Sequence, residues 1–254
     1  MKKLSLLSLI LILGVNVFAQ NENTITISGQ ITDFDGNPID SSVVMLMHKN
    51  FSSAYETYSD AKGYYALKDV EKGQYIALFA MRLKEYPQAN AVSEEDMRLE
   101  FWAWNIIADH DLTINPHYHR LELYEFQVFE VFGGAPYLLA YVRPMSLGKL
   151  LAYEKDVYLD KNKSEKVSDI SIEAKDIEFK LYADKELLTI HSVQPINEYH
   201  GENNQPTRAF FLQFDRPKEF SGGNYCVFRI EAIHKAFGEE KGENVYFYEI
   251  KDYK

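Results

Sequence analysis

The chain has 254 residues, with 38 acidic and 27 basic side chains and a formal net charge of −11. A surface of this sign repels nucleic acid and anionic lipid, so neither is expected as a partner. The single cysteine, Cys226, excludes an intramolecular disulfide, so apolar cores alone must stabilise the fold.

Residues 1–19 have the organisation of a secretory signal peptide. Two lysines precede an apolar run from Leu4 to Val15, and Val17–Ala19 has the small-x-small pattern of a signal peptidase site. The apolar run is shorter than the roughly 20 residues of a membrane span. We therefore expect cleavage after Ala19, export to the periplasm or beyond, and no membrane span. No cysteine lies near the cleavage point, so a lipoprotein anchor is not expected.

The remaining chain is long for one domain, and we expect two, at 20–120 and 121–254. In the first, apolar and polar residues alternate from Thr24 to Thr32, which predicts a half-buried strand. Turn-forming residues then separate short apolar segments. Further strands are expected at 43–47, 64–67, 74–82, 101–107 and 111–114.

The second half has the same organisation. Its predicted strands are RLELYEFQVFEVF, YLLAYV, DISIEA, IEFKLY, ELLTIHSV, RAFFLQF, YCVFRIEAI and NVYFYEI. Charged or Gly- and Pro-containing segments such as KNKSEK are predicted to be loops, and Ser146 a loop serine. There is no sustained helical periodicity. The sequence therefore predicts an all-β protein of two β-sandwich domains.

A spaced set of residues in the first half resembles the carboxypeptidase regulatory-like domain, a seven-stranded transthyretin-like sandwich common in exported bacterial proteins. The matching residues are Gly29, Ile31, Asp33, Gly36, Pro38, Ile39, Ser59, Asp60, Gly63, Tyr65, Leu67, Gly73 and Tyr75. The resemblance implies a non-catalytic module that links neighbours and in some relatives contacts carbohydrate. The chain departs from the family where Asp40–Ser42 replaces the usual Gly-Ala, and in the insertion from Tyr86 to Trp104. Residues 121–254 resemble no family that we recognise.

Physical chemistry gives several of these residues structural roles. Glycines permit turns that a Cβ would obstruct, and aspartates accept hydrogen bonds from turn amides. A tyrosine two residues after a glycine can bury its ring while its hydroxyl bonds the backbone. The residues expected to build turns are Asp33, Gly36, Pro38, Asp60, Gly63, Gly73 and Tyr75.

The segment FWAWN contains both tryptophans of the chain. On a strand, Trp102 and Trp104 project from one face, and with Phe101 they could form a platform on which sugar rings stack. The alternative is that the rings pack in a core or an interface, where large aromatic side chains usually lie.

Histidines near residue 117 are the weak candidates for a metal site. His117 and His119 share a face if they lie on a strand, but nothing fixes a third and fourth ligand. A polar turn after a proline is the alternative. The His119-x-x-Glu122 spacing matches zinc carboxypeptidases, with His234 as an imaginable third ligand. We reject that function because the β pattern leaves no room for their α/β catalytic domain, and we expect no metal or cofactor.

The sequence contains neither a G-x-S-x-G elbow nor a glycine-rich phosphate loop. We expect a non-catalytic binding or scaffold protein that docks an envelope or extracellular protein. One alternative is a carbohydrate-binding protein that uses the aromatic segment. A second alternative is a hydrolase with its site in the C-terminal half, since paired carboxylates cannot be recognised from sequence alone.

Overall fold

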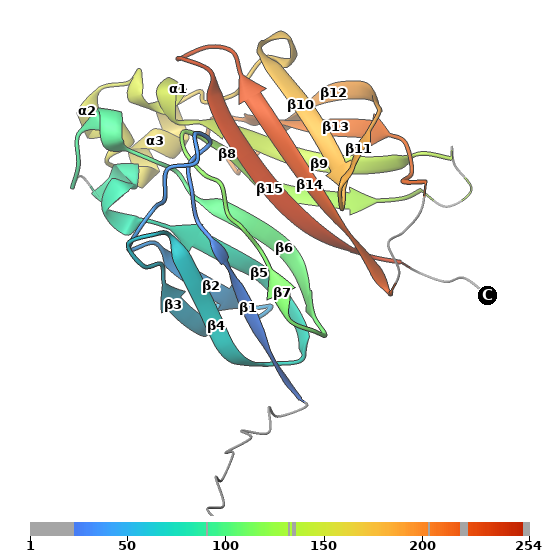
Figure 1. The fold of residues 1–254 in the computed structure, drawn as a ribbon. Helices are drawn as coiled ribbons and strands as arrows, with labels where there is room; N and C mark the ends of the chain where they lie inside the picture. The colour runs from blue at the N-terminus through green and yellow to red at the C-terminus, as the bar shows by residue number, and fades with distance from the viewer. Residues whose placement is uncertain are drawn as a thin grey trace, which may run out of the picture.

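The structure, a computed structural model, describes residues 23–250 apart from 90, 132, 134, 135, 203 and 219–222. The described residues form fifteen strands in three sheets, which confirms the all-β class (Figure 1). The predicted signal peptide lies outside them. Within the described part of the chain, no helix is both long and apolar enough to cross a membrane.

A three-stranded sheet forms the outer layer of the first half, in the order β4–β1–β7. Its strands are β1 (Thr24–Gln30), β4 (Tyr64–Glu71) and β7 (Leu112–Thr113). Strand β1 pairs antiparallel with β4 and parallel with β7, which is short and lies at one edge of the sheet.

An eight-stranded sheet runs through both halves, in the order β11–β10–β14–β15–β6–β5–β2–β3. Its strands are β2 (Val43–Met47), β3 (Ser53–Tyr58), β5 (Gly73–Met81), β6 (Phe101–Ala108), β10 (Ile177–Ala183), β11 (Glu186–Leu188), β14 (Tyr225–His234) and β15 (Glu240–Glu249). Strands β15 and β6 join the halves by parallel pairing, with Val245 opposite Ala103. The sheet thus crosses the predicted boundary at residue 120, and that boundary stays a prediction.

A four-stranded sheet covers the second half, in the order β12–β13–β9–β8. Its strands are β8 (Leu121–Phe129), β9 (Leu138–Ser146), β12 (Ile190–Glu198) and β13 (Thr207–Phe214). All pairings in this sheet are antiparallel, and β8 forms the edge nearest the first half.

The two smaller sheets cover opposite faces of the large sheet. Val245 and Phe247 on β15 belong to the core under the three-stranded sheet. Trp102 and Trp104 on β6 belong to the core under the four-stranded sheet. Because side chains alternate between faces along a strand, each small sheet covers a different face and a different part of the large one. On each face, the large sheet therefore continues uncovered beyond the edge of the smaller sheet that packs on it.

Three short helices follow β9, where the sequence predicted loops. They are α1 (Leu147–Leu151), α2 (Lys155–Tyr158) and α3 (Lys161–Val167). Ser146 is not a loop serine: it ends β9 and accepts a hydrogen bond from the Lys149 N–H at 3.1 Å. The Asp160 carboxylate caps α3 in the same way, by accepting a hydrogen bond from the Lys163 N–H. Such caps stabilise helices that are too short to show apolar periodicity.

The predicted strand DISIEA is wrong. Residues 169–173 form no regular element, and the 3₁₀ turn Ala174–Asp176 follows. The Asp169 carboxylate accepts the Ser171 N–H at 3.0 Å, and the Lys149 ammonium donates to the Ser171 carbonyl. Side chains thus satisfy backbone groups that a strand would have paired with a neighbour. Ile172 still buries its side chain.

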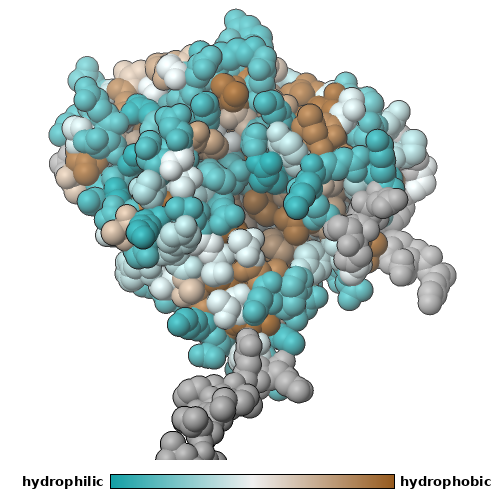
Figure 2. All heavy atoms as spheres, viewed as in Figure 1, coloured by the Kyte–Doolittle hydropathy of each residue, from teal (hydrophilic) through white to brown (hydrophobic). Residues whose placement is uncertain are grey.

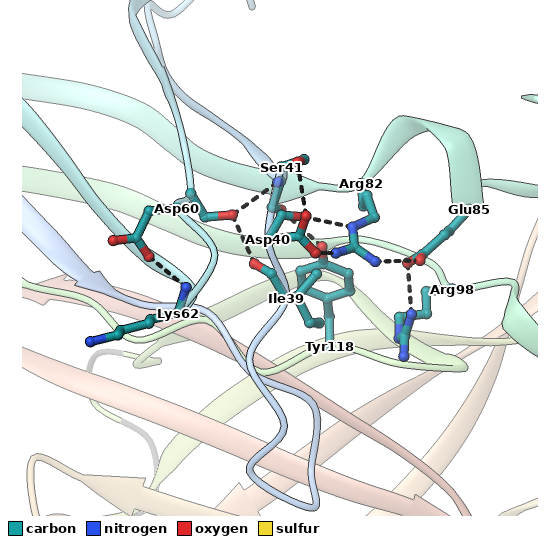
Figure 3. A network of polar contacts seen from close by, with 11 residues as sticks. Ile39, Asp40, Ser41, Asp60, Lys62, Arg82, Glu85, Arg98 and Tyr118 are labelled. Atoms are coloured by element: carbon teal, nitrogen blue, oxygen red, sulfur yellow. Dashed lines mark hydrogen bonds and ion pairs between the residues drawn. The ribbon is translucent and has the colours of Figure 1, made fainter.

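The long segment after β5 contains three 3₁₀ turns, at Leu83–Glu85, Pro87–Ala89 and Glu94–Asp96. A buried carboxylate holds it to the first half: Glu85 bonds Arg82 at 2.6 Å and Arg98 at 2.7 Å (Figure 3). Arg82 also donates to the Asp40 carbonyl at 2.6 Å. Two guanidinium groups thus compensate the burial of one carboxylate.

The first predicted turn closes around one carboxylate. Asp33 accepts the N–H groups of Asp35 and Asn37, each at 2.9 Å. Gly36 has φ +84°, which favours glycine, and Pro38 forms an isolated bridge back to the chain just after β1. These residues have the local structural roles that their types indicate.

The second predicted turn has the same form. Asp60 accepts the N–H groups of Lys62 at 2.8 Å and Tyr64 at 2.9 Å. Gly63 has φ +78°, and a Cβ there would lie 2.3 Å from the Ile31 carbonyl oxygen. Glycine is therefore required at this position by both conformation and space.

Gly73 and Tyr75 lie at the start of β5. The Tyr75 hydroxyl donates to the Glu71 carbonyl at 2.8 Å, and its ring is buried. Gly73 has no positive φ, and a Cβ there would contact nothing within 4 Å. Tyr75 therefore has the predicted structural role, whereas neither conformation nor space requires glycine at position 73.

Candidate functional site

A cleft lies at the edge of each smaller sheet, and the two clefts are on opposite faces of the large sheet. Beside β7 lies a cleft of about 860 Å³, with Val245 and Phe247 in its floor. Figure 2 shows apolar surface between β7 and the β14–β15 hairpin, with hydrophilic side chains around it. Beside β8 lies a cleft of about 560 Å³, with Trp104 and Tyr246 in its wall. We call these the β7 cleft and the aromatic cleft.

Aromatic rings dominate the wall of the aromatic cleft. They are Phe51, Tyr75, Trp104, Tyr124 and Tyr246. The Phe51 ring lies edge-on to Trp104 with 6.3 Å between centroids, and Tyr124 lies edge-on to the same indole at 5.7 Å. Apart from Ile76, the rest of the lining consists of polar side chains that can donate or accept hydrogen bonds. These are Lys49, Gln74, Asn105, Glu125 and Gln127.

The predicted aromatic trio is divided between two cores. Trp102 and Trp104 stack with centroids 4.9 Å apart, but each indole is only 8% exposed. Phe101 points to the opposite core and is fully buried. Tyr124 of β8 lies against both indoles and covers them. The two indoles therefore do not form an open platform, and Trp104 but not Trp102 lines the aromatic cleft.

Three non-glycine residues of this cleft have backbone conformations that side chains disfavour. Phe51 has φ +63°, Asn105 φ +54° and Glu125 φ +52°. Positive φ is uncommon outside glycine and is exceptional for a bulky residue, and such strain tends to gather at functional sites. Three of these residues around one cleft make it our candidate site.

At Glu125 and Asn105, the two strained residues that lie on strands, the hydrogen-bonded pairing with a neighbouring strand is interrupted. The β8–β9 register shifts between Tyr124 and Gln127, so Glu125 lies in a bulge. On β6, Asn105 directly follows the last residue that pairs with β15, and its amide donates to the Phe247 carbonyl at 2.7 Å. Bulges and ladder ends redirect side chains beside binding sites. Here both features place polar groups at the rim of an aromatic wall.

One arginine organises the charges on the β8 side of the cleft. The Arg143 guanidinium lies over the Tyr124 ring, 4.9 Å from its centroid. It also bonds the Glu125 carboxylate at 3.5 Å and the Glu198 carboxylate at 2.5 Å. A stacked and paired arginine fixes the orientation of the Tyr124 ring. On this side of the cleft, one guanidinium is thus paired with two carboxylates.

A pair of buried carboxyl groups lies near Trp102. Burial raises the pKa of Glu100 to about 7. Burial, and then the charge of Glu100, raise the pKa of Glu122 well above its usual range. The Glu100 Oε2 and Glu122 Oε1 atoms have no hydrogen-bond partner among the described residues. Both groups therefore keep their protons to a higher pH than a free glutamate does, as buried like-charged carboxyls do.

The structure separates the two histidines that were weak metal candidates. His117 lines the β7 cleft, where its Nδ1 lies 3.1 Å from a Glu243 carboxylate oxygen, and this bond raises its pKa. His119 lines a different hollow beside Arg120, and burial lowers its pKa. The described residues contain no group of three or more His, Cys, Asp or Glu that could hold a metal ion.

Glu122 and His234, the other residues that matched the ligand pattern of zinc carboxypeptidases, contact other groups. Glu122 is buried beside Glu100, as described above. His234 is buried with its Nδ1 3.0 Å from Glu240, whose carboxylate also accepts the Ser146 hydroxyl and the Gly148 N–H. This cluster holds the start of α1 against the β14–β15 turn. Cys226 is buried, and burial raises the pKa of its thiol to about 12.

No known family model matches the chain, and no curated protein is similar to it in sequence. The carboxypeptidase regulatory-like resemblance therefore stays a prediction. Among solved structures, the chain is similar to a candidate carbohydrate-binding protein from Bacteroides uniformis, with 12% identity, 89% of this chain and 99% of that one covered, and a TM-score of 0.29.

Two other solved structures are similar at the same level. A DUF3823 family protein from Bacteroides ovatus has 10% identity, coverage of 88% and 98%, and a TM-score of 0.26. The major pilin SpaD from Corynebacterium diphtheriae has 9% identity, coverage of 88% and 64%, and a TM-score of 0.26. No functional conclusion follows from similarities this low.

Proposed function

We propose that the protein is an exported, non-catalytic carbohydrate-binding protein whose site is the aromatic cleft. The observation that carries the proposal is the meeting of three strained residues, Phe51, Asn105 and Glu125, around the ring of Trp104. Export follows from the signal peptide expected at residues 1–19.

The chemistry of the cleft suits a sugar. Pyranose rings have apolar C–H faces that pack on aromatic rings, here Phe51, Trp104 and Tyr124. Sugar hydroxyls need planar donors and acceptors at the rim, which Gln74 and Gln127 supply. A concave site with an apolar wall and a few polar groups is the usual form of a small-molecule site.

A glycan array followed by calorimetry tests the proposal. We expect Phe51→Ala to weaken binding of the best glycan about tenfold, because it removes one exposed wall of the cleft. Phe237→Ala is the matched control, since the two phenyl rings are 51% and 52% exposed and both have positive φ. No binding on the array, or equal affinities for the two variants, would contradict the proposal.

The β7 cleft supports a second function, the docking of an envelope protein. Its floor includes Val227, Val245 and Phe247, which continue beyond the edge of the three-stranded sheet. An edge strand beside an apolar floor can accept an extended segment by strand addition. Co-purification of one envelope protein with the wild type, abolished by Val227→Glu, is the expected result. Equal capture by both proteins would count against it.

A further inference from the structure

The outer face of the four-stranded sheet carries a row of side chains that leads away from the aromatic cleft. Gln127, Tyr141, Phe211 and Gln194 lie directly opposite one another on β8, β9, β13 and β12. Strand β9 alternates between buried and half-buried residues, and Tyr141 is on the half-buried, outer side. No other described sheet packs on this face.

The centre of the row is aromatic. The rings of Tyr141 and Phe211 lie edge-on with centroids 5.8 Å apart, and Phe129 approaches Phe211 at 6.2 Å. Phe211 is 36% exposed in the middle of a strand. Exposed aromatic side chains that gather on an uncovered sheet face are typical of a binding surface.

The row is physically continuous with the aromatic cleft. Gln127 belongs to both, since it lines the cleft and begins the row. A second connection runs through Arg143, which lies over the Tyr124 ring of the cleft and bonds Glu198. The Tyr141 hydroxyl donates to the other oxygen of the Glu198 carboxylate. One network therefore fixes rings in both places.

We propose that the aromatic cleft and this row form one track, and that the ligand is a neutral polysaccharide chain rather than a single sugar. The inference rests on the proposed carbohydrate function. Neighbouring strands lie about 4.8 Å apart, so the row extends roughly 14 Å, or about three sugar rings beyond the cleft. None of the four side chains of the row is charged, and Arg143 is paired with both Glu125 and Glu198, so the track favours an uncharged chain.

Calorimetry with malto-, cello-, xylo- and manno-oligosaccharides of two to six units tests the track. In the series that binds, we expect affinity to rise with length up to about four or five units and then level. Phe211→Ala should weaken the hexamer about tenfold and leave the dimer unchanged. Tyr199→Ala is the control, because Tyr199 is 79% exposed and outside the row. Thermal melting confirms that each variant folds.

The outcomes separate the two proposals. If dimer and hexamer bind equally, or Phe211→Ala leaves hexamer affinity unchanged, while Phe51→Ala still weakens binding, the track is wrong and the cleft remains. If Phe51→Ala has no effect on any ligand, the cleft is wrong. If no oligosaccharide in the four series binds, both the cleft and the track are wrong for neutral glycans.

Discussion

The indole of Trp102 lies parallel to the indole of Trp104, with 7° between their planes and 4.9 Å between centroids. The two residues have different surroundings despite this contact. Trp104 lines the aromatic cleft, whereas Trp102 is wedged between Phe79, at 4.7 Å, and Tyr124, at 5.6 Å. Trp104 therefore belongs to the candidate site, and Trp102 packs against the Trp104 indole within the core.

This difference predicts a stability effect at Trp102. Trp102→Ala should lower the free energy of unfolding by about 3–5 kcal/mol, because it leaves a cavity beneath the four-stranded sheet. Urea denaturation followed by circular dichroism measures the change. Trp102→Phe, which keeps an aromatic ring, should cost clearly less. A cost below about 1 kcal/mol for the alanine variant would mean that the indole is not part of the core.

The buried carboxyl pair predicts a pH dependence of stability. Because the folded-state pKa of Glu100 and of Glu122 is raised, the folded protein binds more protons than the unfolded chain. Their contribution is fully favourable below about pH 4.5, and it is lost as pH rises through about 7 and above. Glu122→Gln should therefore raise the free energy of unfolding at pH 8 and flatten the profile.

The control for the carboxyl pair is Glu95→Gln, since the Glu95 side chain is exposed. Urea melts at pH 5, 6.5 and 8 compare both variants with the wild type. A Glu122→Gln variant that is less stable than the wild type at pH 8 would show that the Glu122 side chain is ionised and well compensated.

Glu240 predicts a large loss of stability on truncation. Its buried carboxylate accepts bonds from the Ser146 hydroxyl and the Gly148 N–H, and it lies 3.0 Å from His234 Nδ1. Glu240→Ala should cost about 3 kcal/mol, because several buried polar groups lose their partner at once. Glu239→Ala, next to it on the surface, should change stability by less than about 0.5 kcal/mol. Equal thermal midpoints for the two variants would contradict this assignment.

Two glycines of the predicted turns distinguish the cost of a positive φ from the cost of a steric clash at Cβ. Gly36 and Gly63 both have positive φ, but only at Gly63 would a Cβ meet a neighbour, at 2.3 Å from the Ile31 carbonyl. Gly36→Ala should cost about 1 kcal/mol and Gly63→Ala clearly more, as measured by chemical denaturation. If Gly36→Ala were the more damaging change, the close approach at Gly63 would not limit the fold.

Much of the local structure could be predicted from the sequence, because alternation and turn chemistry act over a few residues. The Asp33 and Asp60 turns and the strand FWAWN are examples. The parallel pairing of β15 with β6 could not be predicted, since no local pattern indicates which distant strand is a partner. The helices 147–167 were missed because they are too short to show periodicity, although the caps Ser146 and Asp160 were visible.

The candidate site was found only in part. Trp104 was identified by its residue type, but its cover by Tyr124 depends on a sheet from the other half of the chain. Phe51 and Glu125 were missed because neither residue type favours positive φ, so the strained backbone leaves no signal in the sequence. Asn105 offered a weak signal, since asparagine tolerates that conformation more readily.

The most direct test of the carbohydrate cleft uses the two indole N–H resonances of the protein, since the chain contains only two tryptophans. We predict that titration with a bound oligosaccharide shifts the Trp104 indole resonance strongly and the Trp102 resonance weakly, with the Phe51→Ala variant needing about tenfold more ligand. Saturable binding that leaves the Trp104 resonance unmoved would place the site elsewhere and contradict the account.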